Sequence, residues 1–140
     1  MPTWILFALL SAIFAALVAI FGKIGIKDID STLATTVRAV IMAGFLVITS
    51  FFLGKADLLK TINNKALLFI ALSGIAGAIS WLCYFFALKT GPAPSVAALD
   101  RLSVVFVLIF AALVLGESFT LKSGIGAILL TIGAVLMTLK

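Results

Sequence analysis

The stretch Thr3–Gly22, TWILFALLSAIFAALVAIFG, decides the fold, because it runs for 20 residues without a charge. An α-helix needs about 20 predominantly apolar residues to cross the hydrocarbon core of a bilayer. No basic residue precedes this run, and the first charge along the chain is Lys23. The pattern therefore favours a transmembrane helix over a cleaved signal peptide.

Four further segments have a length close to that of a membrane span. Ala66–Leu88 and Ser123–Leu139 are uncharged, whereas Leu33–Leu53 and Ser95–Leu115 carry charges inside. We predict an all-α integral membrane protein in one transmembrane domain, residues 1–140, in the cell (inner) membrane. The expected helices cover approximately residues 3–22, 32–53, 66–88, 94–115 and 121–139.

Composition agrees with a lipid environment. The chain is 64% hydrophobic and 11% charged, whereas soluble domains are near 45 to 50% apolar and about 25% charged. The net charge of +5 comes from lysines and arginines spread between apolar runs, which is typical of membrane-edge anchors and not of a nucleic-acid surface. Histidine is absent and Cys83 is the only cysteine, so we expect a buried thiol, no metal site, no cofactor and no catalytic residues.

Short connections separate the spans. The segment Lys89–Pro94 contains one glycine and two prolines, which end one helix and start the next. Residues 54–65 are long enough for an amphipathic turn. Thr120 is the expected N-cap of the last helix, with Glu117 near the positive end of that helix.

The lysines of the connections are balanced across the bilayer. With five spans, one side carries Lys55, Lys60, Lys65 and Lys122, and the other carries Lys23, Lys27, Lys89 and Lys140. The positive-inside rule therefore gives no orientation. Insertion in both orientations is one explanation, and it would let two copies form a transporter of two inverted repeats.

Several motifs resemble the EamA domain of the drug/metabolite transporter superfamily. They are Ala87–Leu99 (ALKTGPAPSVAAL), Phe110–Glu117 (FAALVLGE) and Gly126–Gly133 (GAILLTIG). Phe21-Gly22-Lys23 and Arg38 also match the family pattern, and Val104 stands where many members carry proline. The resemblance covers essentially the whole chain.

The resemblance implies a five-helix half of a ten-helix fold whose two halves are inverted. Such a fold encloses a central cavity that passes metabolites or drugs by alternating access. Because one chain supplies only one half, the resemblance implies a homodimer, antiparallel or parallel.

Ionisable residues inside spans are the candidate solute-binding residues, because they are costly in lipid and usually face a cavity or a partner. These are Arg38, Asp100 and Arg101. Counted from the helix starts, Arg38 and Asp100 both lie about 10 Å inside the bilayer. Trp81 reaches a similar depth, and Tyr84 shares its helix face.

Two interpretations of these residues stand. In the first, Arg38 or Arg101 binds an anionic group, and Asp100 carries a proton or pairs with an arginine. In the second, Arg38 and Asp100 form a buried salt bridge that only fixes packing. If Arg38 balances Asp100, then Arg101 is the remaining charge, and we expect it to face the cavity and favour solutes with a carboxylate or phosphate. For Trp81 and Tyr84 we favour packing over solute contact.

Two other features have alternative explanations. Lys23 either reaches the cavity or anchors the helix at the interface, and we favour the anchor. Small residues predict close helix contacts, either between subunits or within one. They are Gly74 and Gly77 in the third span, and Ser123, Ala127 and Thr131 in the last.

We therefore expect a secondary transporter of a small-molecule solute, without an ATP site because no P-loop pattern is present. The alternative is a membrane scaffold or accessory subunit that does not transport. An enzyme is not expected, because no nucleophile lies beside a recognisable base.

Overall fold

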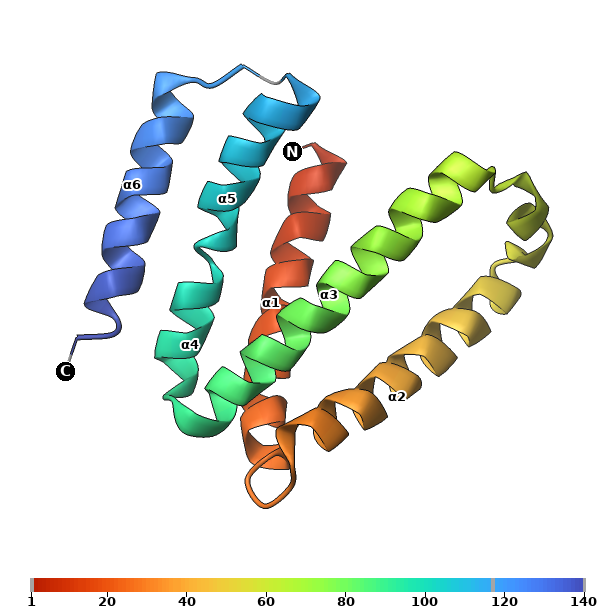
Figure 1. Cartoon of the computed structure of the whole chain (residues 1–140), viewed down its shortest axis with the longest axis horizontal. Helices are drawn as coiled ribbons and strands as arrows, with labels where there is room; N and C mark the ends of the chain where they lie inside the picture. Colours follow the sequence, from red (N-terminus) through yellow and green to blue (C-terminus); the bar gives the residue numbers. More distant parts are fainter. Residues whose placement is uncertain (1, 117, 140) are drawn as a thin grey trace. The chain divides into compact units, whose positions relative to one another are not determined.

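The computed structural model describes residues 2–116 and 118–139, and for Lys60 the backbone alone. These residues form helices and no strand (Figure 1). In chain order the elements are α1 (Thr3–Gly25), α2 (Ser31–Phe52), the 3₁₀ helix η1 (Ala56–Thr61), α3 (Asn64–Thr90), α4 (Ala93–Asp100), α5 (Ser103–Phe110), the π-helix η2 (Ala111–Leu115) and α6 (Leu121–Leu136).

The all-α prediction is confirmed. Among the described residues, α1, α2, α3 and the stretch Ala93–Leu115 are long and apolar enough to cross a membrane. The last helix, α6, is shorter, with 16 residues, because it ends at Leu136 and not at Leu139. The connection after α2 holds the short helix η1, as its length predicted.

Side-chain caps fix where two helices begin. Asp30 precedes α2 and accepts hydrogen bonds from the backbone N–H groups of Leu33 at 3.0 Å and Thr32 at 2.9 Å. The bond from Leu33 is the main cause that lowers the pKa of the Asp30 carboxyl, and the charge of Lys89 also lowers it. At α6, Thr120 forms the predicted N-cap, in a reciprocal capping box with Ser123. Glu117 lies outside the described residues.

Prolines mark the start of α4, as the sequence predicted, and a glycine follows η2. Pro92 is the N-cap of α4 and Pro94 lies in its first turn, where a missing N–H costs nothing. Gly116 follows η2 with φ +68°, and its N–H bonds to the Ala111 carbonyl. A residue with a side chain is strained at this φ, so glycine suits the position.

The helix expected over 94–115 occupies the predicted stretch but is interrupted. A turn at Arg101 and Leu102 separates α4 from α5. There the hydrogen bonds shorten to the i→i−3 pattern, because the Leu102 N–H bonds to the Leu99 carbonyl and the Val104 N–H to the Arg101 carbonyl. A proline at position 104 would lack the N–H group that bonds within the helix and would break the helix there. This chain has Val104 at that position, and its helix is interrupted without a proline.

The chain divides into two compact units, and the first comprises residues up to Gly22 together with those from Thr90 onward. In this unit α6 packs against α4 and α5. The Ser95 hydroxyl of α4 donates to the Met137 carbonyl at 2.7 Å. The less exposed residues of α6 include Ser123, Ala127, Thr131 and Ala134. The small-residue stripe therefore lies on the better-covered face of α6, as expected for packing within one subunit.

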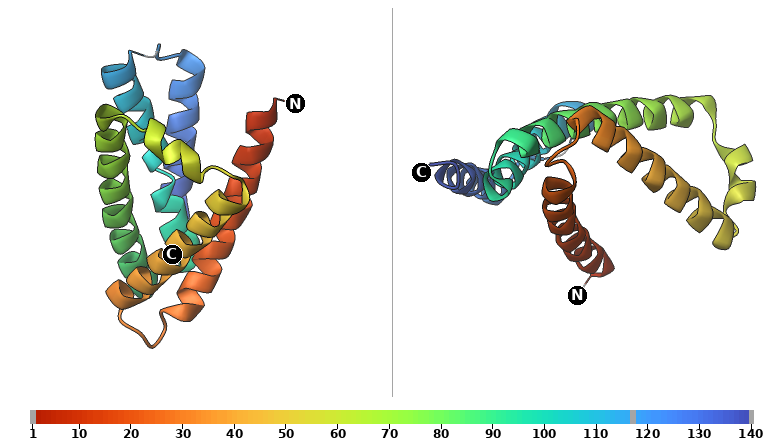
Figure 2. Two further views of the ribbon diagram at one scale, coloured as in Figure 1. Left: turned by 90° about the vertical axis from the view of Figure 1, so that its right-hand side faces the viewer. Right: turned by 90° about the horizontal axis from the view of Figure 1, so that it is seen from below.

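The second unit comprises Lys23–Lys89. Its helices α2 and α3 lie close at one end and diverge toward η1 (Figures 1 and 2). The buried residues of this unit gather at the narrow end, where the chain enters α2 and leaves α3. They are Ile26, Ser31, Thr35, Phe85 and Leu88.

Two lysines tie this narrow end together. The Lys23 ammonium donates to the Leu88 carbonyl and, at 3.4 Å, to the Lys89 carbonyl. The Lys89 ammonium donates at 2.7 Å to the Ile29 carbonyl in the α1–α2 loop. The last carbonyls of a helix lack partners within the helix and favour a nearby cation. Lys23 thus caps α3, a role that the sequence did not predict.

We predict that Lys23→Met lowers the free energy of unfolding by about 1 to 3 kcal/mol, because it leaves the buried end of α3 without a charged hydrogen-bond donor. Thermal unfolding of the protein in detergent measures this. Lys27→Met is the matched control, since Lys27 is exposed in the adjacent turn. Equal losses in the two variants would contradict a specific capping role.

Candidate solute-binding site

Arg38 of α2 lies against aromatic rings of α3. Its guanidinium carbon is 4.0 Å from the centroid of Trp81 and 4.9 Å from that of Phe85. Both distances are within the range of a cation–π interaction, which contributes about 0.5 to 2 kcal/mol. Phe85 is fully buried and Trp81 is half-buried. The predicted shared depth of Arg38 and Trp81 is therefore realised as direct contact.

The Arg38 cation is incompletely satisfied by its surroundings. Its Nη1 atom is buried and finds no hydrogen-bond acceptor among the described residues. A buried donor without an acceptor costs about 1 to 3 kcal/mol, and more when the group is charged. Aromatic rings offset part of that cost, but they do not replace an anion.

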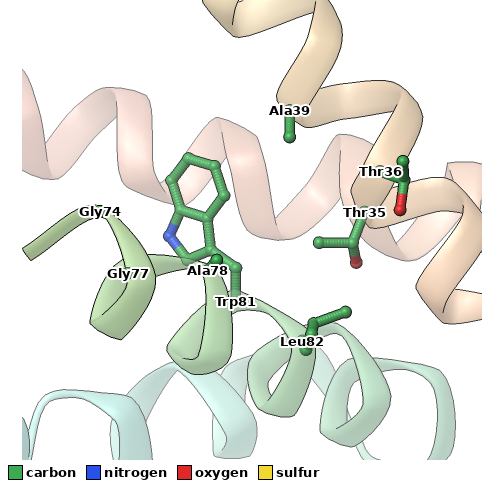
Figure 3. A pocket seen from close by; sticks show the side chains of 8 residues that line it. All are labelled: Thr35, Thr36, Ala39, Gly74, Gly77, Ala78, Trp81 and Leu82. Carbon is green, nitrogen blue, oxygen red and sulfur yellow. The ribbon is translucent and has the colours of Figure 1, made fainter. Parts of the chain in front are cut away.

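A hollow of about 490 Å³ lies beside this contact, between α2 and α3 (Figure 3). The Trp81 indole projects from α3 toward Ala39 of α2. The remaining lining residues are small or apolar: Thr35, Thr36, Gly74, Gly77, Ala78 and Leu82. The hydroxyls of Thr35 and Thr36 donate to carbonyls of their own helix, those of Ser31 and Thr32. The hollow therefore offers a mainly apolar surface.

Two glycines of α3 make no close helix contact within the single chain. Gly74 and Gly77 were predicted to bring helices into close contact, but a methyl group built on either meets no atom within 4 Å. Both line the hollow. At these positions the small residues leave space.

The other aromatic and sulfur groups of α3 lie elsewhere. Tyr84 makes an edge-to-face contact with Phe85, with ring centroids 5.8 Å apart, and does not line the hollow. Cys83 is exposed on α3, so the expectation of a buried thiol is wrong within the single chain. An apolar helix in lipid has no need to cover such a residue.

Asp100 and Arg101 belong to the first unit, at the turn between α4 and α5. Asp100 is half-buried as the last residue of α4, and Arg101 is exposed as the residue that follows it. Arg38 belongs to the second unit, and its pairing with Asp100 stays a prediction. Among the described residues, no group of three or more His, Cys, Asp or Glu side chains is placed to hold a metal ion.

Comparison with known proteins identifies the family. The model of the EamA-like transporter family matches residues 2–139. This chain belongs to the EamA-like transporter family. A curated relative from Sinorhizobium sp, described as an uncharacterized transporter in the cobO 3'region, is 43% identical over 135 residues. These residues cover 96% of this chain and 96% of the relative. No solved structure matches the chain significantly.

The EamA membership confirms the resemblance drawn from the motifs and supports a membrane transporter over an enzyme. It also agrees with the apolar helices that the structure describes. The candidate site that the structure describes in most detail is the contact of Arg38 with Trp81 and the adjoining hollow.

We predict that Arg38 and Trp81 are energetically coupled in the folded protein. Arg38→Gln and Trp81→Leu should each lower stability, and the double variant should lose about 0.5 to 2 kcal/mol less than the sum, because the cation–π contact can be lost only once. Thermal unfolding of the three variants in detergent measures the coupling. Strictly additive losses would show that the contact contributes nothing.

Proposed function

We propose that this chain is a secondary transporter that works as a homodimer of two five-helix halves and passes solutes bearing a carboxylate or phosphate. The observation that carries the proposal is the break in the fourth span, where an exposed Arg101 follows the end of α4. Transporters of inverted-repeat type form their solute sites from discontinuous helices near the middle of the membrane. An arginine at such a break attracts anions.

One observation favours a second copy as partner. The curated relative is matched over 96% of its own length, so a single five-helix domain makes up nearly all of that protein. A second copy inserted in the opposite orientation would supply the inverted repeat, and the balanced lysines permit that insertion.

Asp100 is the candidate for coupling. As a half-buried carboxylate within the span and next to Arg101, it either carries a proton or pairs with an arginine. A scaffold or accessory subunit is the competing function. Flux by the purified protein alone, reconstituted in liposomes, distinguishes the two, because a scaffold produces none.

We predict that the C-terminus is accessible from both sides of the membrane. A cysteine tag after Lys140, in a Cys83→Ser background, should be labelled partly by an impermeant reagent in intact cells and fully after permeabilisation. Labelling from one side alone would rule out the antiparallel homodimer and leave a parallel dimer or a different partner.

We predict that Arg101→Gln leaves folding and dimerisation intact but lowers the uptake of anionic solutes into liposomes about ten- to a hundredfold. That range corresponds to the loss of a charged hydrogen bond, worth about 1.5 to 3 kcal/mol. Lys122→Gln, which removes an exposed cation of the same unit, is the control. Unchanged flux in Arg101→Gln would overturn the role of this residue.

A further inference from the structure

Three features meet at one place in the second unit. Arg38 has a buried Nη1 without an acceptor, Trp81 lies beneath the guanidinium, and Trp81 also lines the hollow between α2 and α3. Trp81 thus contacts the Arg38 guanidinium and also borders the apolar hollow. A ligand that combines an anionic group with an apolar body would satisfy both at once.

Neither α2 nor α3 carries a carboxylate that could accept from Arg38. The acidic residues of Lys23–Lys89 are Asp28, Asp30 and Asp57, and none of them lies in α2 or α3. Asp30 is already used as the N-cap of α2. An anion for Arg38 must therefore come from outside this unit.

The hollow favours an organic ligand over a small inorganic anion. Its volume of about 490 Å³ is within the range of roughly 300 to 1,000 Å³ that is typical of small-molecule sites. Glycine and alanine side chains leave the space open, and Trp81 provides an aromatic surface for packing. A hydrated phosphate would gain little from such walls.

We propose that this hollow binds the apolar body of an organic carboxylate and that Arg38 binds the carboxylate. Arg38 rests on Trp81 and Phe85 when the site is empty and turns toward the carboxylate when the ligand enters. The carboxylate then offers a charge-assisted, bidentate contact, which is stronger than a cation–π contact. This inference names the solute class of the proposed transporter and rests on that function for its physiological meaning.

A fluorescence experiment tests the site without measuring transport. The chain has two tryptophans, Trp4 and Trp81, so Trp4→Phe leaves Trp81 as the only one. Bromine quenches indole emission on contact, which makes 4-bromophenylacetate a suitable probe. The neutral 4-bromophenylacetamide has the same body without the charge, and sodium bromide measures collisional quenching.

We expect saturable quenching by 4-bromophenylacetate, with an affinity at least tenfold higher than that of the amide. Arg38→Gln should remove this preference. Gly77→Leu should fill the hollow and abolish saturable quenching by both probes, because Gly77 lines the hollow and a Cβ added there meets no atom within 4 Å. Gly44→Leu is the matched control, since Gly44 lies in α2, is equally open and does not line the hollow.

The same chemistry belongs to a fatty-acid anion from the bilayer. Quenching by 9,10-dibromostearate that Gly77→Leu abolishes and Gly44→Leu preserves would identify lipid as the source of the carboxylate. Quenching by 4-bromophenylacetate alone would identify a water-soluble solute.

Equal affinities for acid and amide would overturn the role of Arg38, and saturable quenching that survives Gly77→Leu would overturn the hollow as the site. The test of this site and the test of the proposed function can fail independently. Binding without flux would refute transport and keep the site, whereas carboxylate flux without quenching of Trp81 would refute the site and keep transport.

Discussion

The bilayer core gives the backbone no hydrogen-bond partner, and this constraint determines the whole structure. Each long apolar segment must satisfy its own N–H and C=O groups, which only a helix does within one segment. The break at Arg101 and Leu102 obeys the same rule, because the Leu102 and Val104 amides exchange the α-helical bond for the i→i−3 bond. A span can therefore bend there while its amides stay bonded. The exposed Arg101 lies at this break.

The same constraint acts at the ends of helices, where carbonyls are left without partners. Lys23 donates to carbonyls at the end of α3, and Lys89 donates to the Ile29 carbonyl in the α1–α2 loop. They draw α2 and α3 together over the buried Phe85 and Leu88. The two helices are held together at this end and diverge toward the other (Figure 2). The hollow lies between these two helices.

The sequence predicted what depends on local patterns. The length of the apolar runs predicted the helices. Pro92 and Pro94 predicted the start of α4, and Thr120 predicted the N-cap of α6. It missed what depends on distant contacts. The pairing of Lys23 with Leu88 joins residues 65 positions apart, and no local signal marks it. The break in the fourth span contains neither proline nor glycine. Small residues at regular spacing fit close contact and open space equally well, and within the single chain Gly74 and Gly77 line the hollow between α2 and α3.

The two in-span arginines differ in how their charge is accommodated. Arg38 is covered by aromatic rings that stabilise a cation without neutralising it. Arg101 is exposed at a break in an apolar helix. If packing alone mattered, apolar residues of similar volume would serve both positions at no cost in stability. A cation in a span requires a compensating group, which is a carboxylate of the protein, such as the predicted partner Asp100, or the anionic solute of the proposed function. In the proposed site the aromatic contact holds Arg38 in place when no anion is bound, and a charge-assisted contact with a carboxylate is strong enough to replace it.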